Sequence, residues 1–284
     1  MSDQRRSQIA GIALMSIAML AVPMVDGAAK ALTSAHSPLY ISWARYAVAS
    51  AIVIPFAVAR YGKSFLPREQ LGAHLARTIF LVAAMTSYFL AIAHVPLAAA
   101  NSAYFVGPVV AMALAVVFLG EALTAPKVVS LALAFGGTLS VLRPSGSVDP
   151  ALLLALASGA FFALYMIATR KASRESDPVK TLAFQCLVGA ALLAPQAIFA
   201  WSTPAVDELW LFALMGALSA ASHILSITAF RYAPASTLAP LVYLELIGSV
   251  AVGYLAFGEA PDSSVWVGAP AIILGGLILL RRPR

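Results

Sequence analysis

Three ionisable side chains lie inside long apolar stretches, namely Asp26, Arg45 and Glu245. A charged group in lipid is costly, so such residues normally face protein or a water-filled cavity. We expect Asp26 and Arg45, which lie in the outer halves of neighbouring predicted helices, to pair with each other. Glu245 has no basic residue on its own predicted helix, and three roles stay open for it. It contacts the ammonium group of a solute, carries a coupling proton, or forms a salt bridge to Arg45 or Arg77.

Polar, aromatic and methionine side chains follow helical spacing on the same stretches, so each set shares one helix face. Residues 98–119 present Asn101 and Tyr104 near Pro108, which leaves a backbone carbonyl free. Residues 209–230 present His223 among serines. Ordinary packing explains such faces too, because methionine and aromatic stripes are usually core and a lone histidine is usually structural. The candidate binding residues are Met19, Asp26, Tyr88, Asn101, Tyr104, Phe162, Tyr165, His223 and Glu245.

Signatures of catalysis and of metal binding are missing from the sequence. Gly62-Lys63-Ser64 ends like a phosphate-binding loop, but Ala57 stands where that loop needs its first glycine. The chain has no H-E-x-x-H or G-x-S-x-G motif. Its single cysteine, Cys186, allows no intrachain disulfide and no cysteine-based metal cluster. The sequence therefore predicts a protein that is not an enzyme and that uses no cofactor or metal.

The elements that must position these residues are membrane-spanning helices. The chain has 284 residues, of which 61% are hydrophobic and only 11% are charged, whereas soluble domains carry roughly 25% charged residues. Its mean hydropathy is +0.90. Long apolar runs recur along the chain, and each can cross a hydrocarbon core of about 30 Å as a helix. We predict an all-α integral membrane protein whose partner is the lipid bilayer. Nucleic acid is not a predicted partner, because the basic residues are scattered between the runs.

Turn signals such as Ser37-Pro38 and Pro261-Asp262 separate the apolar runs. They divide the chain into ten predicted transmembrane helices: 9–31, 38–58, 71–93, 98–119, 126–142, 151–170, 178–201, 209–230, 236–257 and 264–280. With the N-terminus inside, the inner segments hold 14 lysines and arginines and the outer loops hold 2, Lys30 and Arg143. By the positive-inside rule both the N- and C-termini are then cytoplasmic, in a bacterial-type inner membrane.

The chain also repeats itself at a nearly fixed offset. An offset of 138 residues superimposes the pairs Pro96/Pro234, Glu121/Glu259 and Gly137/Gly275, and an offset of 140 superimposes Pro38/Pro178. The halves 1–144 and 145–284 therefore hold five predicted helices each. Because five is odd, the second half enters the membrane from the opposite side, which predicts two inverted repeats. Glu121 and Glu259 end hairpins just before residues that cap helices, and we interpret both as structural.

The repeated motifs carry a family resemblance. Pro96-Leu-Ala-Ala-Ala-Asn101, then Gly107-Pro108, Phe118-Leu-Gly-Glu121 and Gly136-Gly137, resembles the second part of an EamA repeat of the drug/metabolite transporter superfamily. The second half repeats it with Pro234, Phe257-Gly-Glu259 and Gly275-Gly276, but Leu246 stands at the position equivalent to Pro108. The resemblance implies a central cavity lined by the first, third, fourth, sixth, eighth and ninth helices. It also implies that the fifth and tenth helices pack at the periphery.

The resemblance implies a function as well, because members of this superfamily export amino acids and drugs or import metabolites such as riboflavin and S-adenosylmethionine. Methionine and aromatic faces suit apolar side chains. We therefore expect a secondary transporter that exports small metabolites, first of all neutral, apolar or aromatic amino acids, by alternating access around a central cavity. The alternatives are an importer of a larger metabolite of the riboflavin or S-adenosylmethionine type and, with least support, an intramembrane enzyme. The direction of transport, proton coupling and the oligomeric state stay open.

Overall fold

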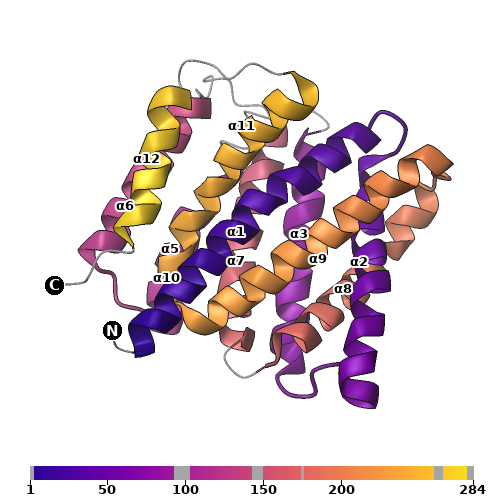
Figure 1. Ribbon diagram of the computed structural model, residues 1–284, viewed down its shortest axis with the longest axis horizontal. Helices are drawn as coiled ribbons and strands as arrows, with labels where there is room; N and C mark the ends of the chain where they lie inside the picture. Colours follow the sequence, from indigo (N-terminus) through magenta and orange to yellow (C-terminus); the bar gives the residue numbers. More distant parts are fainter. Residues whose placement is uncertain (1–2, 93–102, 143–149, 174–175, 259–264, 280–284) are drawn as a thin grey trace.

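The structure is a computed structural model in which residues 3–92, 103–142, 150–173, 176–258 and 265–279 are described, and these ranges contain helices and no strand. The α-helices are α1 (Asp3–Leu32), α2 (Pro38–Tyr61), α3 (Leu71–Ile92), α5 (Gly107–Leu119), α6 (Ala125–Leu142), α7 (Pro150–Ser173), α8 (Pro178–Phe199), α9 (Leu209–Tyr232), α10 (Ala235–Leu238), α11 (Leu244–Phe257) and α12 (Val265–Ile278) (Figure 1). Three short 3-10 helices accompany them, η1 (Gly62–Ser64), η2 (Val206–Glu208) and η3 (Ala239–Tyr243).

These helices have the length and polarity of membrane spans. In the described ranges, 7 helical segments are long and apolar enough to cross a membrane: Arg6–Leu32, Pro38–Ser64, Leu71–Ala91, Leu153–Ala172, Pro178–Phe199, Val206–Tyr232 and Ala235–Ala256. Three shorter apolar helices are Gly107–Leu119, Ala125–Ser140 and Trp266–Ile278. Large apolar side chains such as Phe199 and Leu255 are 92% and 81% exposed, and exposed apolar surface of this kind fits lipid better than water. The predicted all-α membrane fold is confirmed at this level.

Two of the predicted helices are wrong as continuous elements. In the span predicted at 98–119, a turn at residues 105–106 precedes α5, which begins at Gly107 with Pro108 in its first turn. The span predicted at 236–257 is divided into α10, η3 and α11, and η3 contains Pro240. Proline lacks the N–H that an α-helix needs and its ring clashes with the preceding turn, so each break falls beside a proline.

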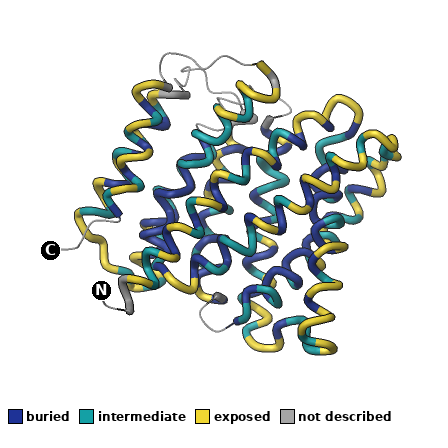
Figure 2. Tube along the Cα trace, viewed as in Figure 1, coloured by how far each residue is buried: buried dark blue, intermediate teal, exposed yellow. Residues whose placement is uncertain are grey.

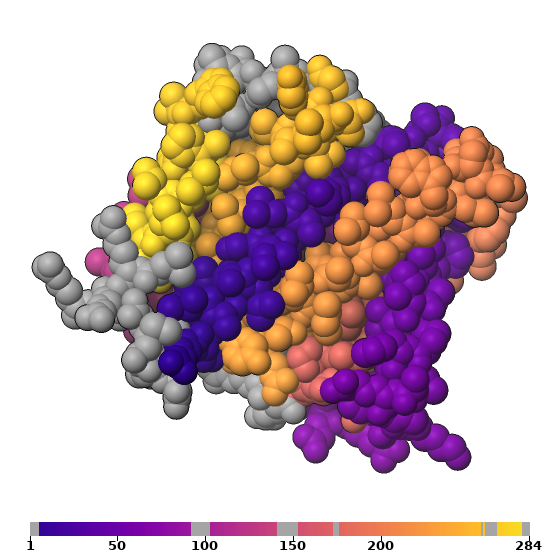
Figure 3. Space-filling view, viewed as in Figure 1, coloured from indigo at the N-terminus to yellow at the C-terminus, as the bar shows by residue number. Residues whose placement is uncertain are grey.

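The helices pack in pairs that join the two halves of the chain. α1 packs against α9, α3 against α7, α2 against α8 and α6 against α12. The α6 and α12 pair lies at one edge of the bundle, as the resemblance implied (Figure 1). Buried residues gather where the central helices cross, whereas exposed residues line α12 and the outer edges (Figure 2). On the face shown in Figure 3, side chains of α1, α9 and α11 lie next to one another and cover the interior.

The bundle has a terminal end, where α1 begins and α12 ends, and an opposite end, where the α1–α2 loop lies (Figure 1). At the opposite end, His36 ties this loop to the loop between α8 and α9. Its Nε2 lies 2.9 Å from a carboxylate oxygen of Glu208, and its Nδ1 lies 2.5 Å from the hydroxyl of Ser202. The two loops come from different halves of the chain, so this contact joins the halves.

At the terminal end, Glu121 joins the halves in a similar way. Its two carboxylate oxygens accept hydrogen bonds from the backbone N–H groups of Ala235 and Ser236, at 3.0 and 2.8 Å. The Nε of Arg170 lies 3.7 Å from the same carboxylate. Glu121 therefore supplies acceptors for the first turn of α10, which agrees with its structural interpretation. Glu259 lies outside the described residues.

Candidate functional site

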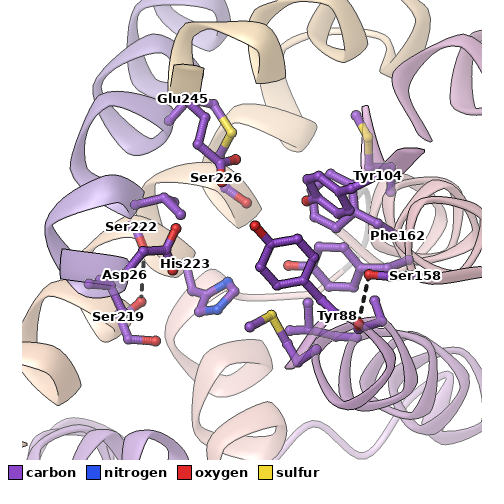
Figure 4. Close-up of a pocket in the computed structure, with 18 of the residues that line it drawn as sticks. Asp26, Tyr88, Tyr104, Ser158, Phe162, Ser219, Ser222, His223, Ser226 and Glu245 are labelled. Atoms are coloured by element: carbon purple, nitrogen blue, oxygen red, sulfur yellow. Dashed lines mark hydrogen bonds between the residues drawn. The ribbon is translucent and has the colours of Figure 1, made fainter. Parts of the chain in front are cut away.

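A cavity lies at the centre of the bundle, between the halves of the chain (Figure 4). Its volume is about 70 Å³, which holds several water molecules because each needs roughly 10–15 Å³ of such volume. Side chains from α1, α2, α3, α7, α9 and α11 line it, together with Tyr104 from the turn before α5. The set of helices is close to the one that the resemblance implied.

The cavity holds two carboxyl groups and one guanidinium. Asp26 comes from α1, Glu245 from the first turn of α11 and Arg45 from α2. Glu245 lies within electrostatic range of both Asp26 and Arg45. With all three groups ionised, this set carries a net charge of −1. An excess of negative charge in a closed apolar site attracts a cation.

The expected pairing of Asp26 with Arg45 is wrong as a direct contact. The two side chains interact electrostatically, but no ion pair joins them in the part of the chain that the structure describes. There, the buried Nη2 of Arg45 has no hydrogen-bond partner either. A buried donor without a partner costs about 1–3 kcal/mol, so Arg45 is poised to bind an acceptor that enters the cavity.

Aromatic rings form a chain along one wall of the cavity. The ring centroids of Tyr88 and Tyr104 are 5.4 Å apart, and those of Tyr104 and Phe162 are 5.5 Å apart. Tyr165 follows at 5.7 Å from Phe162, and His223 follows at 6.5 Å from Tyr165. Figure 4 shows these rings directed into the same space. Such a wall can stack on a planar ring of a ligand or face a cation.

Hydroxyl groups and methionines complete the lining. Ser222 donates to the carbonyl of Ser219 at 3.1 Å, and Ser158 donates to the carbonyl of Ala84 at 2.7 Å. Because these protons are already used, the two hydroxyl oxygens can only accept further hydrogen bonds. Four methionines adapt their shape to an apolar ligand surface: Met15, Met19, Met85 and Met166.

The structure brings together eight of the nine candidate residues: Met19, Asp26, Tyr88, Tyr104, Phe162, Tyr165, His223 and Glu245 all line the cavity. Asn101 lies outside the described residues. That these side chains bind a solute stays a prediction. Among the residues that were not candidates, Arg45 and Met85 also line the cavity. Arg45 carries the same signal as Asp26, a charge deep in an apolar stretch, but we had assigned its charge to a partner helix.

Arg77 is not the partner of Glu245, so that alternative is wrong. Its side chain is fully buried between α3, α7 and α8, beyond the cavity wall. Its Nη2 donates to the side-chain carbonyl of Gln185 at 2.6 Å and to the hydroxyl of Tyr165 at 3.4 Å. Its Nε donates to Thr169 at 3.2 Å, and its Nη1 donates to the carbonyl of Thr181 at 3.4 Å. All of these acceptors are neutral.

Comparisons with known proteins agree on a family. The model of the EamA-like transporter family matches residues 9–143 and 149–281. An S-adenosylmethionine uptake transporter of Rickettsia conorii is 28% identical over 281 residues, which cover 99% of this chain and 95% of that protein. A riboflavin transporter of Brucella anthropi is 27% identical over 249 residues, which cover 85% of this chain and 87% of that protein. One crystal structure has the same fold, with a TM-score of 0.78 at 20% identity over 98% of this chain and 96% of that chain.

Proposed function

This chain belongs to the EamA-like transporter family, and from that premise we propose that it is a secondary transporter of a solute like S-adenosylmethionine. Such a solute carries an amino-acid end, a second cationic centre and an aromatic ring. The observation that carries the proposal is the presence of two carboxyl groups, one guanidinium and a chain of rings in one cavity. The apolar helices and the family together make the chain a multi-pass membrane transporter of a small molecule.

The charges of the cavity complement those of S-adenosylmethionine one by one. The solute has an ammonium and a sulfonium group, which two carboxylates can face, and one carboxylate, which the Arg45 guanidinium can bind with two parallel hydrogen bonds. Asp26 and Glu245 supply the two carboxylates. The adenine ring can stack on the aromatic wall, and a sulfonium is attracted to the faces of aromatic rings. The relative from Rickettsia conorii is named for this solute.

The other candidate solutes leave part of this arrangement unused. A neutral amino acid has one cationic group, so one of the two carboxylates stays without a partner. Riboflavin has a planar ring for the aromatic wall but no charge for Asp26, Arg45 or Glu245. It remains the second candidate because the Brucella anthropi relative is named as its transporter. Export of amino acids, which we expected first from the sequence, ranks behind both, since neither of these relatives bears such a name.

The cavity must widen to hold such a solute. Its volume of about 70 Å³ is well below the roughly 300 Å³ of the smaller ligand pockets. Alternating access supplies the movement in this proposal, with the halves 1–144 and 145–284 as inverted repeats that move against each other. The helix pairs support it, because α1 packs on α9 as α3 packs on α7, and the offset of about 138–140 residues interchanges the two pairs.

The close contacts of glycines at the α6–α12 interface support the same relation. A Cβ atom on Gly137 would lie 2.6 Å from the carbonyl oxygen of Gly268, and one on Gly275 would lie 2.8 Å from that of Ser130. Exchanging each residue for the one 138 positions away turns the first contact into the second. The proposal places the terminal end of the bundle in the cytoplasm, on the strength of the 14 to 2 charge bias. Proton coupling through Glu245 stays an alternative to its role as a cation ligand.

Reconstitution in liposomes tests this function. Purified protein is assayed for uptake and exchange of radiolabelled S-adenosylmethionine, riboflavin, leucine and phenylalanine, with protein-free liposomes as the control. We expect S-adenosylmethionine to enter and to exchange, and the unlabelled compound to compete. Transport of riboflavin alone would support the second candidate. Transport of leucine or phenylalanine without S-adenosylmethionine would contradict the charge argument.

A further inference from the structure

The buried guanidinium of Arg77 is a fixed charge that the cavity, as it stands, does not use. The side chain has an exposed fraction of 0%, and its four hydrogen bonds go to neutral oxygens of Thr169, Thr181, Tyr165 and Gln185. In the described part of the chain no carboxylate forms a salt bridge with it. A buried ion without a counter-ion is strongly unfavourable, and an intramembrane one normally marks the path of a solute or ion. Arg77 therefore needs a functional explanation.

The repeat supplies one. An offset of 140 residues, which superimposes Pro38 on Pro178, places Arg45 of α2 on Gln185 of α8. The side-chain carbonyl of Gln185 accepts the shortest of the Arg77 hydrogen bonds, 2.6 Å long. The guanidinium of Arg77 thus lies beside the position that corresponds to Arg45 in the other half of the chain. Each half carries one arginine at this corresponding position, from α2 in the first half and from α3, against α8, for the second.

We propose that Arg77 and Gln185 form a second carboxylate-binding position, which takes the carboxylate of the solute when the cavity opens toward the terminal end. The inference rests on the proposed function and on its inverted repeats. In such a transporter the two halves exchange conformations between its two open states. The position beside Gln185 then faces the solute in one state as Arg45 does in the other.

Tyr165 is the group that separates Arg77 from the cavity. It lines the cavity on one side, and on the other side its ring centroid lies 5.3 Å from the guanidinium carbon of Arg77. Its hydroxyl accepts a long bond of 3.4 Å from Arg77. Such a bond is near the limit of hydrogen-bond geometry and is easily broken. A change of rotamer at Tyr165 would free the Nη2 of Arg77 for a carboxylate.

Donors beyond Arg77 continue toward the terminal end. In the described residues, the buried Nε2 of Gln185 has no hydrogen-bond partner, so the amide offers a donor next to the guanidinium. His74, one turn before Arg77 on α3, is buried as well, and its Nε2 lies 2.9 Å from the hydroxyl of Ser176. Ser176 directly precedes the N-cap of α8, Asp177, at this end of the bundle. A row of polar groups therefore leads from the cavity wall to the terminal end.

The variant Gln185→Glu tests the inference without removing a buried contact. The new carboxylate keeps the acceptor for Arg77 and neutralises its charge, so the protein stays folded and its melting temperature stays level or rises. The matched control is Gln196→Glu, which makes the same change on α8 near the opposite end, where Gln196 donates to the carbonyl of Leu39. Transport is measured in right-side-out and inside-out vesicles, with S-adenosylmethionine and its decarboxylated analogue as the two solutes.

We expect Gln185→Glu to raise the KM for S-adenosylmethionine about tenfold from the side of the terminal end, the effect of losing one charge-assisted hydrogen bond. From the other side the KM should change little, because Arg45 binds the carboxylate there. The decarboxylated analogue should be unaffected from both sides, and so should Gln196→Glu with either solute. Wild-type values for Gln185→Glu from both sides would overturn the inference and leave the proposed function intact. Wild-type protein that moves neither solute would overturn the proposed function, and the inference with it.

Discussion

The hydroxyl of Tyr243 donates a hydrogen bond of 2.7 Å to the backbone carbonyl of Phe105, and their ring centroids lie 5.5 Å apart. The two residues are 138 positions apart, which is the offset that superimposes Glu121 on Glu259. Each residue therefore contacts its own counterpart in the other half. In a chain with two-fold-related halves, such a contact occurs only near the axis that relates them. Both residues also lie where a predicted span departs from regular α-helix.

Removing this hydrogen bond should loosen the centre of the bundle. Tyr243→Phe leaves the buried carbonyl of Phe105 without its partner, so we expect a loss of about 1–3 kcal/mol in stability. Thermal unfolding in detergent measures it. The control is Tyr254→Phe on α11, since the Tyr254 side chain is 56% exposed. Equal melting temperatures for the two variants would show that the contact contributes nothing.

The α6–α12 interface offers a test with neighbouring residues. A Cβ atom on Gly137 would meet backbone of α12 at 2.6 Å, whereas one on Gly136 would meet nothing within 4 Å. We expect Gly137→Ala to push the two helices apart and to lower the melting temperature, because small residues allow close packing of helices in membranes. Gly136→Ala should leave it unchanged or raise it slightly, since alanine is the better helix former. A reversed order of the two variants would be inconsistent with the packing of α6 on α12.

The aromatic wall should matter for transport more than for folding. Tyr104→Ala and His223→Ala each remove a ring that lines the cavity, so we expect the KM for the solute to rise roughly tenfold, with stacking energies of about 1–2 kcal/mol per ring. Fluorescence-detected size-exclusion chromatography checks that both variants remain folded. Phe118→Ala, which removes a ring that is 68% exposed on α5, is the control. If both cavity variants kept normal KM values, the cavity would not be the binding site.

The role of Glu245 can be read from one conservative change. Glu245→Gln keeps the shape and the hydrogen-bonding capacity of the side chain but removes its charge. If the carboxylate binds a cationic group of the solute, affinity should fall about tenfold at every pH and the response to an imposed pH gradient should persist. If the carboxyl group carries a coupling proton, exchange should survive while that response disappears. A lowered melting temperature with normal transport would instead identify a structural ion pair, for which Arg45 is the nearby cation.

The orientation in the membrane follows from the distribution of basic residues. A reporter that is active only in the cytoplasm should work when fused after Arg284 and fail when inserted within residues 202–206, in the loop between α8 and α9. The opposite result at the C-terminus would contradict both the orientation and the even number of spans. Loss of both signals, checked by immunoblotting, would mean only that the fusions are degraded, so stable fusions elsewhere in the same loops would replace them.

The sequence by itself determined that this chain is a helical membrane protein, and where most of its spans lie. Hydropathy and helical spacing are local properties, since each apolar run either can or cannot cross a bilayer on its own. The same local spacing selected residues such as Tyr104, Phe162 and His223, because side chains three or four positions apart share a face. The two misjudged spans are local as well, and the prolines beside them, Pro108 and Pro240, were the available signal.

Only the tertiary structure decided which faces meet and which charges are neighbours. From the sequence, Arg45 and Arg77 were equivalent candidates for a salt bridge, whereas in the fold Arg45 lines the cavity and Arg77 lies behind Tyr165. Their surroundings come from helices far apart in the chain, so small differences in helix packing separate a 2.6 Å hydrogen bond to Gln185 from no contact at all. Electrostatic and hydrogen-bond energies depend steeply on such distances. No local pattern of residue types encodes those distances.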